Sequence, residues 1–104
     1  MARWYVVQAE NDLTEAGHMK SRKILFEKRL PYYAKACRHY LKAYEIDASV
    51  FTLMRIEEAM DCCWKANMYD EEEQFKAFEV IYSQEHPQET EHGDSGVALM
   101  DMGG

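Results

Sequence analysis

The sequence predicts a mainly α-helical protein, a compact bundle of about four helices preceded by one short N-terminal β-strand. Apolar side chains recur at steps of three and four residues over most of residues 13–83, which is the spacing of one helix face. Prolines stand near the expected ends of two helices. Residues 3–9 instead concentrate the aromatic and β-branched side chains that favour a strand.

The size and composition fit a single domain. A chain of 104 residues with 47% hydrophobic content can bury one modest core, so we expect a globular helical domain over residues 1–83. Residues 84–104 are rich in Glu, Gln, His, Gly and Ser and contain no aromatic side chain. We expect these residues to form a disordered acidic tail.

The location of the protein can be inferred from its apolar runs and its cysteines. No apolar run approaches the length of about 18 residues that spans a bilayer, and the first residues lack the apolar core of a signal peptide. An odd number of cysteines suits a reducing compartment better than a disulfide framework. We therefore expect a cytoplasmic protein without membrane association, in which Cys37, Cys62 and Cys63 are buried free thiols.

The predicted strand over residues 3–9 is followed by the turn-prone Asn11 and Asp12. These seven residues resemble the opening strand of the N-terminal domain of the NusG transcription elongation factors. The later strands of that family and its aromatic-Pro-Gly-Tyr stretch do not follow, so the resemblance is local and implies no shared function.

Two helices are expected next. The first runs from Leu13 to Leu30, with Gly17 interrupting its early turns and Pro31 ending or kinking it. The second has the clearest apolar face in the chain, made of Tyr33, Ala36, Cys37, Tyr40, Ala43 and Tyr44. Residues 33–48 resemble the second helix of a tetratricopeptide repeat. This resemblance implies a helical hairpin and hints at peptide binding.

A third helix is expected over roughly residues 50–66, capped by Asp47 or Ser49. Its inward positions are Leu53, Ile56, Ala59, Met60, Cys63 and Trp64. A fourth helix is expected to begin at the cap Asp70, with Glu73 completing a capping box, and to stop at Pro87. Its apolar stripe consists of Phe75, Phe78, Ile81 and Tyr82.

The net charge of −7 conceals two regions of opposite sign. Residues 20–42 contain eight Lys or Arg and one acid, whereas residues 43–104 contain 15 acids and three bases. On the expected second helix, Lys35, Arg38 and Lys42 share one face and could touch a nucleic-acid backbone. The simpler reading of this basic stripe is a solvated helix face.

The acidic run of residues 70–73 also has two readings. Carboxylates in the first turn of a helix interact favourably with its dipole, which alone explains the run. Together with Glu57, Glu58 and Asp61, the run could instead form a negative surface that occupies a phosphate-binding groove. Trp64, the acidic run and Phe75 are similar to the acidic segment of one small anti-CRISPR family that blocks the site where Cas9 reads its PAM. This resemblance implies acidic side chains that imitate DNA.

No common catalytic motif occurs in the chain. A nucleophilic Cys62 or Cys63 would need His39 as its base. A zinc site made of Cys37, His39, Cys62 and Cys63 is awkward, because adjacent residues on a helix point about 100° apart. We therefore expect neither enzyme activity nor a cofactor nor a metal.

The sequence favours a non-catalytic acidic inhibitor that neutralises a basic nucleic-acid-handling effector, such as a nuclease or a CRISPR effector, or a toxin. The expected partner-binding residues are Asp70, Glu71, Glu72, Glu73, Glu57, Glu58, Asp61, Trp64 and Tyr69. Two alternatives stay open: a tetratricopeptide-like adaptor or chaperone that binds a peptide, and a nucleic-acid-binding regulator that uses the basic side chains of residues 20–42.

Overall fold

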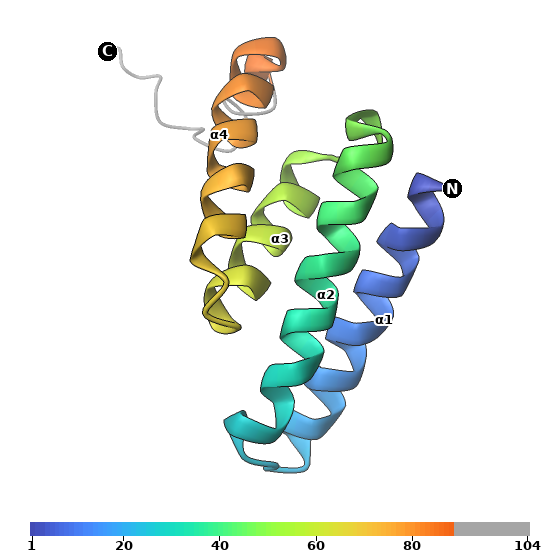
Figure 1. The fold of residues 1–104 in the computed structure, drawn as a ribbon, viewed down its shortest axis with the longest axis vertical. Coiled ribbons are helices and arrows are strands. Elements are labelled where there is room, and N and C mark those ends of the chain that lie inside the picture. The colour runs from blue at the N-terminus through green and yellow to red at the C-terminus, as the bar shows by residue number, and fades with distance from the viewer. Residues whose placement is uncertain (89–104) are drawn as a thin grey trace.

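The chain folds as two helical hairpins. In the computed structural model, which describes residues 1–88, α1 (Ala2–Ser21) and α2 (Phe26–Ile46) form the first hairpin. The second consists of α3 (Leu53–Lys65) and α4 (Tyr69–Glu85), and the short 3-10 helix η1 (Ala48–Val50) joins the two. Figure 1 shows the shorter second hairpin packed along the upper part of α2. The predicted helical bundle is confirmed.

The predicted N-terminal strand is wrong. Residues 3–9 lie inside α1, and the structure contains no strand within residues 1–88. The spacing of the buried side chains gives the physical reason, because Val6, Ala9 and Ala16 recur on one helix face and pack against α2. This tertiary packing outweighs the strand preference of the aromatic and β-branched residues. Gly17 is exposed and does not interrupt the helix.

Small side chains allow α1 and α2 to approach closely. Ala9 on α1 and Ala36 and Ala43 on α2 are fully buried within the shared core. A polar contact crosses the same interface, where Nδ1 of His39 lies 2.7 Å from Oδ2 of Asp12. The first hairpin is therefore closed by alanine packing and by one polar pair.

Helix α2 begins before Pro31, which lies inside it, so this proline does not end a helix. The chain reverses at residues 22–25 instead. Lys23 has a φ of 63° there, in the left-handed region that costs an L-residue about 1 kcal/mol.

An aromatic cluster joins the two hairpins. The ring of Tyr44 on α2 lies 4.7 Å from that of Phe78 and 5.8 Å from that of Phe75, both on α4. Phe51, which follows η1, is buried against the same two rings. Such ring pairs contribute about 0.5–1.5 kcal/mol each beyond their area burial. These rings therefore help to anchor the second hairpin on α2, alongside the packing of α3.

A disulfide between Cys37 on α2 and Cys63 on α3 also joins the hairpins. The prediction of three free thiols is therefore wrong for these two residues, and only Cys62 is free among the cysteines. Cys37 and Cys63 are buried and face each other across two packed helices. Their spacing along the chain does not reveal this proximity. The cysteines consequently no longer support the expected cytoplasmic location, because disulfides are typical of oxidising compartments.

The helix starts also differ from the prediction. Asp47 caps η1, and it is Thr52 that caps α3, with its Oγ1 accepting a hydrogen bond of 3.2 Å from the Arg55 amide. Helix α4 begins one residue before Asp70 and has no side-chain cap, so the predicted capping box with Glu73 is absent. Met68 occupies the N-cap position and Asp70 is already the second residue of the helix, so Asp70 cannot act as the cap.

Helix α4 runs two residues beyond the predicted end of the globular domain at residue 83. Most of the predicted tail, residues 89–104, lies outside the described residues. Within residues 1–88, no helix combines the length and the apolar content that crossing a bilayer requires.

Candidate protein-binding face

The turn between α3 and α4 fixes the positions of the candidate site residues at the end of α3 and the start of α4. Asn67 adopts the left-handed conformation with a φ of 62°. The Met68 amide donates to the Cys63 carbonyl at 2.8 Å, and the Asn67 amide donates to the Trp64 carbonyl at 3.1 Å. This pair of bonds is the Schellman motif, in which a glycine or asparagine ends a helix. As a result α4 follows α3 after only three residues.

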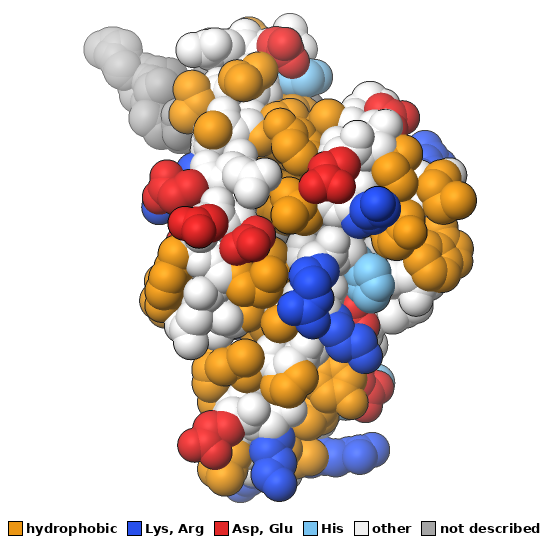
Figure 2. Space-filling view, viewed as in Figure 1, with side chains coloured by type: hydrophobic (Ala, Val, Ile, Leu, Met, Phe, Trp, Pro, Cys, Tyr) orange, Lys and Arg blue, Asp and Glu red, His pale blue; other side chains and the backbone are white. Residues whose placement is uncertain are grey.

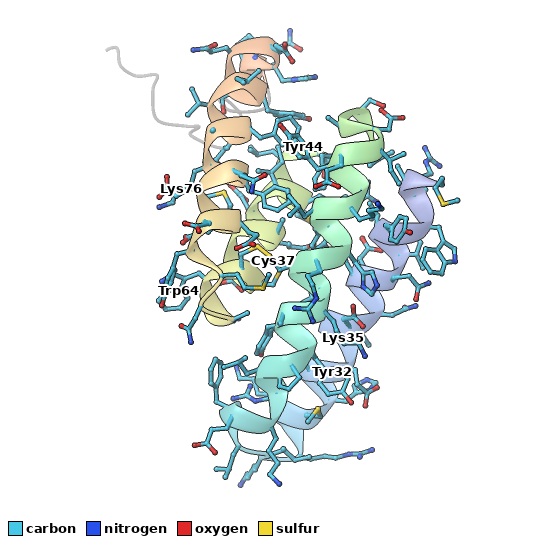
Figure 3. The ribbon with its side chains drawn as sticks, viewed as in Figure 1. Tyr32, Lys35, Cys37, Tyr44, Trp64 and Lys76 are labelled. Atoms are coloured by element: carbon cyan, nitrogen blue, oxygen red, sulfur yellow. A yellow bond between two sulfur atoms is a disulfide. The ribbon has the colours of Figure 1, made fainter. Side chains whose placement is uncertain are left out.

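Two large aromatic side chains flank this turn and are exposed. Trp64 is 57% exposed and Tyr69 is 53% exposed. The Tyr69 hydroxyl donates to Oδ1 of Asn67 at 2.8 Å, which ties the ring to the turn. Figure 3 shows Trp64 at the outer edge of the second hairpin, away from Lys35 on α2. Exposed tryptophan and tyrosine side chains are enriched at protein interfaces.

The expectation that Trp64 points inward is wrong. The buried residues of α3 are Ile56, Ala59, Cys62 and Cys63. Each residue advances the helix by about 100°, so the residue after Cys63 turns away from α2 and toward solvent. Ile81 on α4 was also expected in the core and is half exposed.

Three exposed carboxylates lie within four residues of one of the two rings along the chain. Asp61 lies one turn before Trp64, and Asp70 and Glu73 follow Tyr69 at the start of α4. Residues 53–85 contain nine acids and three bases. We call Asp61, Trp64, Tyr69, Asp70 and Glu73 the acidic turn. It combines exposed apolar area with negative charge within 13 consecutive residues of the chain.

The remaining predicted residues contribute less to this surface. Glu71 is half-buried, and the Glu72 side chain is only 14% exposed and lies 3.9 Å from Nζ of Lys76. Glu57 and Glu58 are exposed but lie about 10 Å from Trp64 along the axis of α3. The predicted set therefore divides into an outer group at the turn and residues that are buried or remote from it.

Glu58 also has a structural contact. Its Oε1 accepts a hydrogen bond of 3.3 Å from the hydroxyl of the buried Tyr40. Burial, and then the charge of Glu58, raises the pKa of Tyr40 well above its usual range. The phenol therefore stays protonated and continues to donate to the carboxylate.

Two ion pairs that the sequence reasoning did not predict moderate the negative charge. Nζ of Lys65 lies 2.8 Å from Oδ2 of Asp61, and Nζ of Lys76 lies 3.6 Å from Oε2 of Glu73. The spacing of three and four residues could have revealed both pairs. Asp70 forms no ion pair with any residue of 1–88.

The basic stripe lies on a different element. Lys35, Arg38 and Lys42 are exposed on α2 and form no ion pair within residues 1–88. Nζ of Lys35 lies 5.3 Å from the ring centroid of Tyr32. Figure 2 shows Lys and Arg side chains over α2 and Asp and Glu side chains over α4, with hydrophobic side chains between them. On this face, basic side chains predominate over the middle of α2 and acidic side chains over α4.

The free thiol of Cys62 is not arranged as a nucleophile. Its Sγ donates to the Ala59 carbonyl at 3.2 Å, and burial, followed by the charge of Asp61, raises its pKa to about 12. His39, which was considered as its base, contacts Asp12. Within residues 1–88 no three His, Cys, Asp or Glu side chains are placed to hold a metal ion.

We expect the folded protein to resist alkylation of Cys62 by iodoacetamide at pH 8, whereas the unfolded, non-reduced chain takes up the label at this residue. The raised pKa favours the neutral thiol in the folded state. The stability it contributes is complete below the ordinary pKa of 9.0 and is lost as the pH rises above that value. Mass spectrometry of the labelled protein measures the reaction. Rapid labelling of the folded protein at pH 8 would contradict this description.

The comparisons with known proteins add no relative, since no family model, no curated protein and no solved structure matches the chain. A functional proposal therefore depends on where the described side chains lie.

Proposed function

We propose that this protein is a non-catalytic inhibitor that binds a basic protein through the acidic turn. The exposure of Trp64 and Tyr69 among three exposed carboxylates supports this function best. A buried aromatic anchor supplies about 2 kcal/mol or more at many interfaces. The surrounding carboxylates attract a positively charged partner and fix its orientation.

The partner that suits this surface handles nucleic acid. Nucleic-acid-binding grooves present Lys and Arg side chains to phosphates, and the carboxylates of Asp61, Asp70 and Glu73 carry charge of the same sign as phosphate. The similarity of residues 64–75 to an anti-CRISPR segment is consistent with this class. We therefore propose a nuclease, a CRISPR effector or a toxin with an exposed basic groove as the partner.

The two alternative functions have weaker support. A peptide-binding adaptor would need an accessible apolar face on the repeat-like helix, but α2 packs against both α1 and α3. A nucleic-acid-binding regulator would rely on Lys35, Arg38 and Lys42, while the net charge of −7 would oppose its approach to phosphates. The ring beside this stripe, Tyr32, is half-buried beneath Lys35 and offers little area for base stacking.

Inhibition of DNA cleavage tests the proposal. The protein would be titrated into a purified Cas9–guide complex and, separately, into purified basic nuclease toxins. We expect inhibition of at least one of them at a ratio near one to one. A triple variant neutralises the acidic turn with Asp61→Asn, Asp70→Asn and Glu73→Gln. A matched control makes the same change in charge at three other exposed acids, with Glu15→Gln, Glu27→Gln and Glu45→Gln.

The acidic-turn variant should inhibit about ten-fold less well, or worse, because each exposed charge at an interface is worth roughly 0.5–1 kcal/mol. The control should inhibit like the unaltered protein. Equal losses in both variants would reduce the effect to net charge alone. Full inhibition by the acidic-turn variant, or no inhibition of any of these effectors by the unaltered protein, would refute the proposal.

A further inference from the structure

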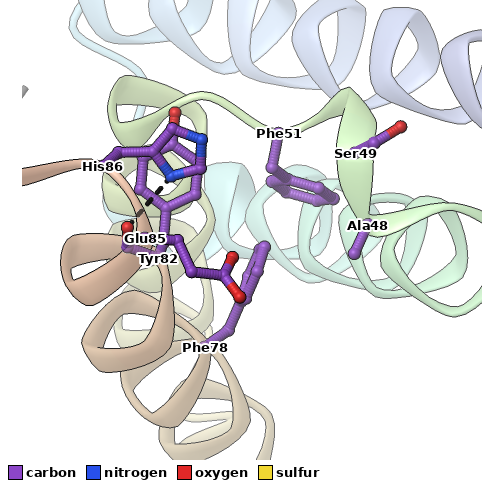
Figure 4. A pocket seen from close by; sticks show the side chains of 7 residues that line it. All are labelled: Ala48, Ser49, Phe51, Phe78, Tyr82, Glu85 and His86. Carbon is purple, nitrogen blue, oxygen red and sulfur yellow. Dashed lines mark hydrogen bonds between the residues drawn. The ribbon is translucent and has the colours of Figure 1, made fainter.

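A pocket of about 300 Å³ lies at the opposite end of the second hairpin, where the end of α4 meets η1 (Figure 4). Two chain segments line it, and the lining residues are Ala48, Ser49, Phe51, Phe78, Tyr82, Glu85 and His86. Tyr69 and Glu85 are 16 positions apart on α4, a distance of about 24 Å along the helix. The pocket is therefore distinct from the acidic turn.

The walls of the pocket are aromatic and held in place. The rings of Phe51 and Phe78 meet edge to face at 5.7 Å, and Phe78 meets Tyr82 in the same way at 6.2 Å. The His86 imidazole stacks on the Tyr82 ring with centroids 4.0 Å apart. Nδ1 of His86 lies 3.0 Å from the Tyr82 carbonyl oxygen, which can only accept, so Nδ1 carries the proton. Aromatic faces carry a negative quadrupole that attracts cations.

The electrostatic surroundings of the pocket are negative. Figure 4 shows the Glu85 carboxylate beside the ring of Phe78. Helices α2 and α4 both end next to the pocket, and neither has a basic residue in its last turn to balance the partial negative charge of its carbonyl groups. Residues 43–54 and 77–88 contain no Lys or Arg, and the nearby Arg55 guanidinium is engaged by the Val50 carbonyl oxygen at 2.8 Å and by Oε2 of Glu10 at 3.5 Å. Glu85 accordingly forms no ion pair within the described residues.

We propose that this pocket binds an alkylguanidinium group. A planar guanidinium can stack on an aromatic face and at the same time donate two hydrogen bonds to a carboxylate, and these are the two kinds of group that the pocket offers. An anion would meet Glu85 and two helix C-termini, all of the wrong sign. An uncharged ligand would form no charge-assisted hydrogen bond with the carboxylate.

A titration followed by amide NMR on the full chain tests the site. The probes are ethylguanidinium and the uncharged N-ethylurea, which has a similar shape. Ethylguanidinium should cause saturable shifts at the amides of Ser49, Phe78 and Glu85, and N-ethylurea should cause none. Glu85→Gln should weaken the binding of ethylguanidinium at least five-fold. Glu15→Gln, which neutralises an exposed acid on α1 outside both proposed sites, should leave the affinity unchanged.

Two results would overturn the proposal. One is equal binding of ethylguanidinium and N-ethylurea, and the other is the absence of saturable shifts at the pocket amides. Unaltered affinity in the Glu85→Gln variant would also exclude the carboxylate as the recognition group. This variant changes an exposed side chain, so a failure to fold is not expected to obscure the result.

The source of the guanidinium is determined by comparing free L-arginine with an acetylated and amidated Gly-Arg-Gly peptide. Tighter binding of the amino acid would identify a small-molecule ligand. Tighter binding of the peptide would identify an arginine side chain of a protein. Both results retain the site, and neither depends on whether the acidic turn binds a basic effector.

Discussion

Removing the disulfide between Cys37 and Cys63 is expected to lower the free energy of unfolding by about 3.5 kcal/mol. The bond closes a loop with a sequence separation of 26, and most of its effect comes from restricting the unfolded chain. It also ties α2 to α3, so its loss loosens the attachment of the second hairpin. Urea unfolding of the Cys37→Ala/Cys63→Ala variant measures this change.

The same loss should follow when a reducing agent is added to the unaltered protein. Cys62→Ala is the matched control, because it removes a buried sulfur from the same helix and leaves the disulfide intact. This variant should lose about 1 kcal/mol at most, through a small cavity. If reduction leaves the unfolding midpoint of the unaltered protein unchanged, the disulfide does not contribute as expected.

Replacing Trp64 with alanine is expected to weaken binding to the inhibited effector about 30-fold, which corresponds to roughly 2 kcal/mol. The indole is the largest exposed apolar group of the acidic turn, and a partner that covers it gains both apolar burial and shape complementarity. Because the side chain is more than half exposed, the thermal midpoint should change little. Calorimetric titration measures the affinity.

Trp4→Ala provides the control for this experiment. Trp4 is 55% exposed, nearly the same as Trp64, but lies on α1 near the other end of the chain. It should bind the effector as tightly as the unaltered protein. An equal loss from both tryptophan variants would indicate a general effect of surface hydrophobicity, and no loss from Trp64→Ala would remove this residue from the interface.

The helices with a regular apolar period could be predicted from the sequence, and residues 3–9 could not. The pattern of α2 is unambiguous, since Tyr33, Cys37 and Tyr40 recur at helical steps and are all buried. Residues 3–9 carry strand-favouring side chains, and their helical conformation depends on packing against α2, which local preference does not encode. Whether Cys37 and Cys63 come close enough to form a disulfide likewise depends on how α2 and α3 pack.

The sequence predicted which residues belong to the candidate site, but not which of their side chains reach solvent. The acidic run and the nearby aromatic residues are visible in the sequence. Which of them reach solvent depends on the side of α4 that packs on the core, and this places Asp70 outside and Glu72 largely inside. The expectation for Trp64 is wrong because Cys63 and Trp64 are both apolar and lie next to each other on α3. The sequence pattern alone does not show which of these two neighbouring side chains faces the core.

Hydrogen–deuterium exchange on the complex with the inhibited effector tests the central claim most directly. The first amides of α4 have no intrahelical acceptor and should exchange quickly in the free protein. Binding through the acidic turn predicts slower exchange at residues 61–73 and no change at residues 2–21 or 35–42. Protection confined to residues 35–42 or to α1, with residues 61–73 unaffected, would contradict binding through the acidic turn.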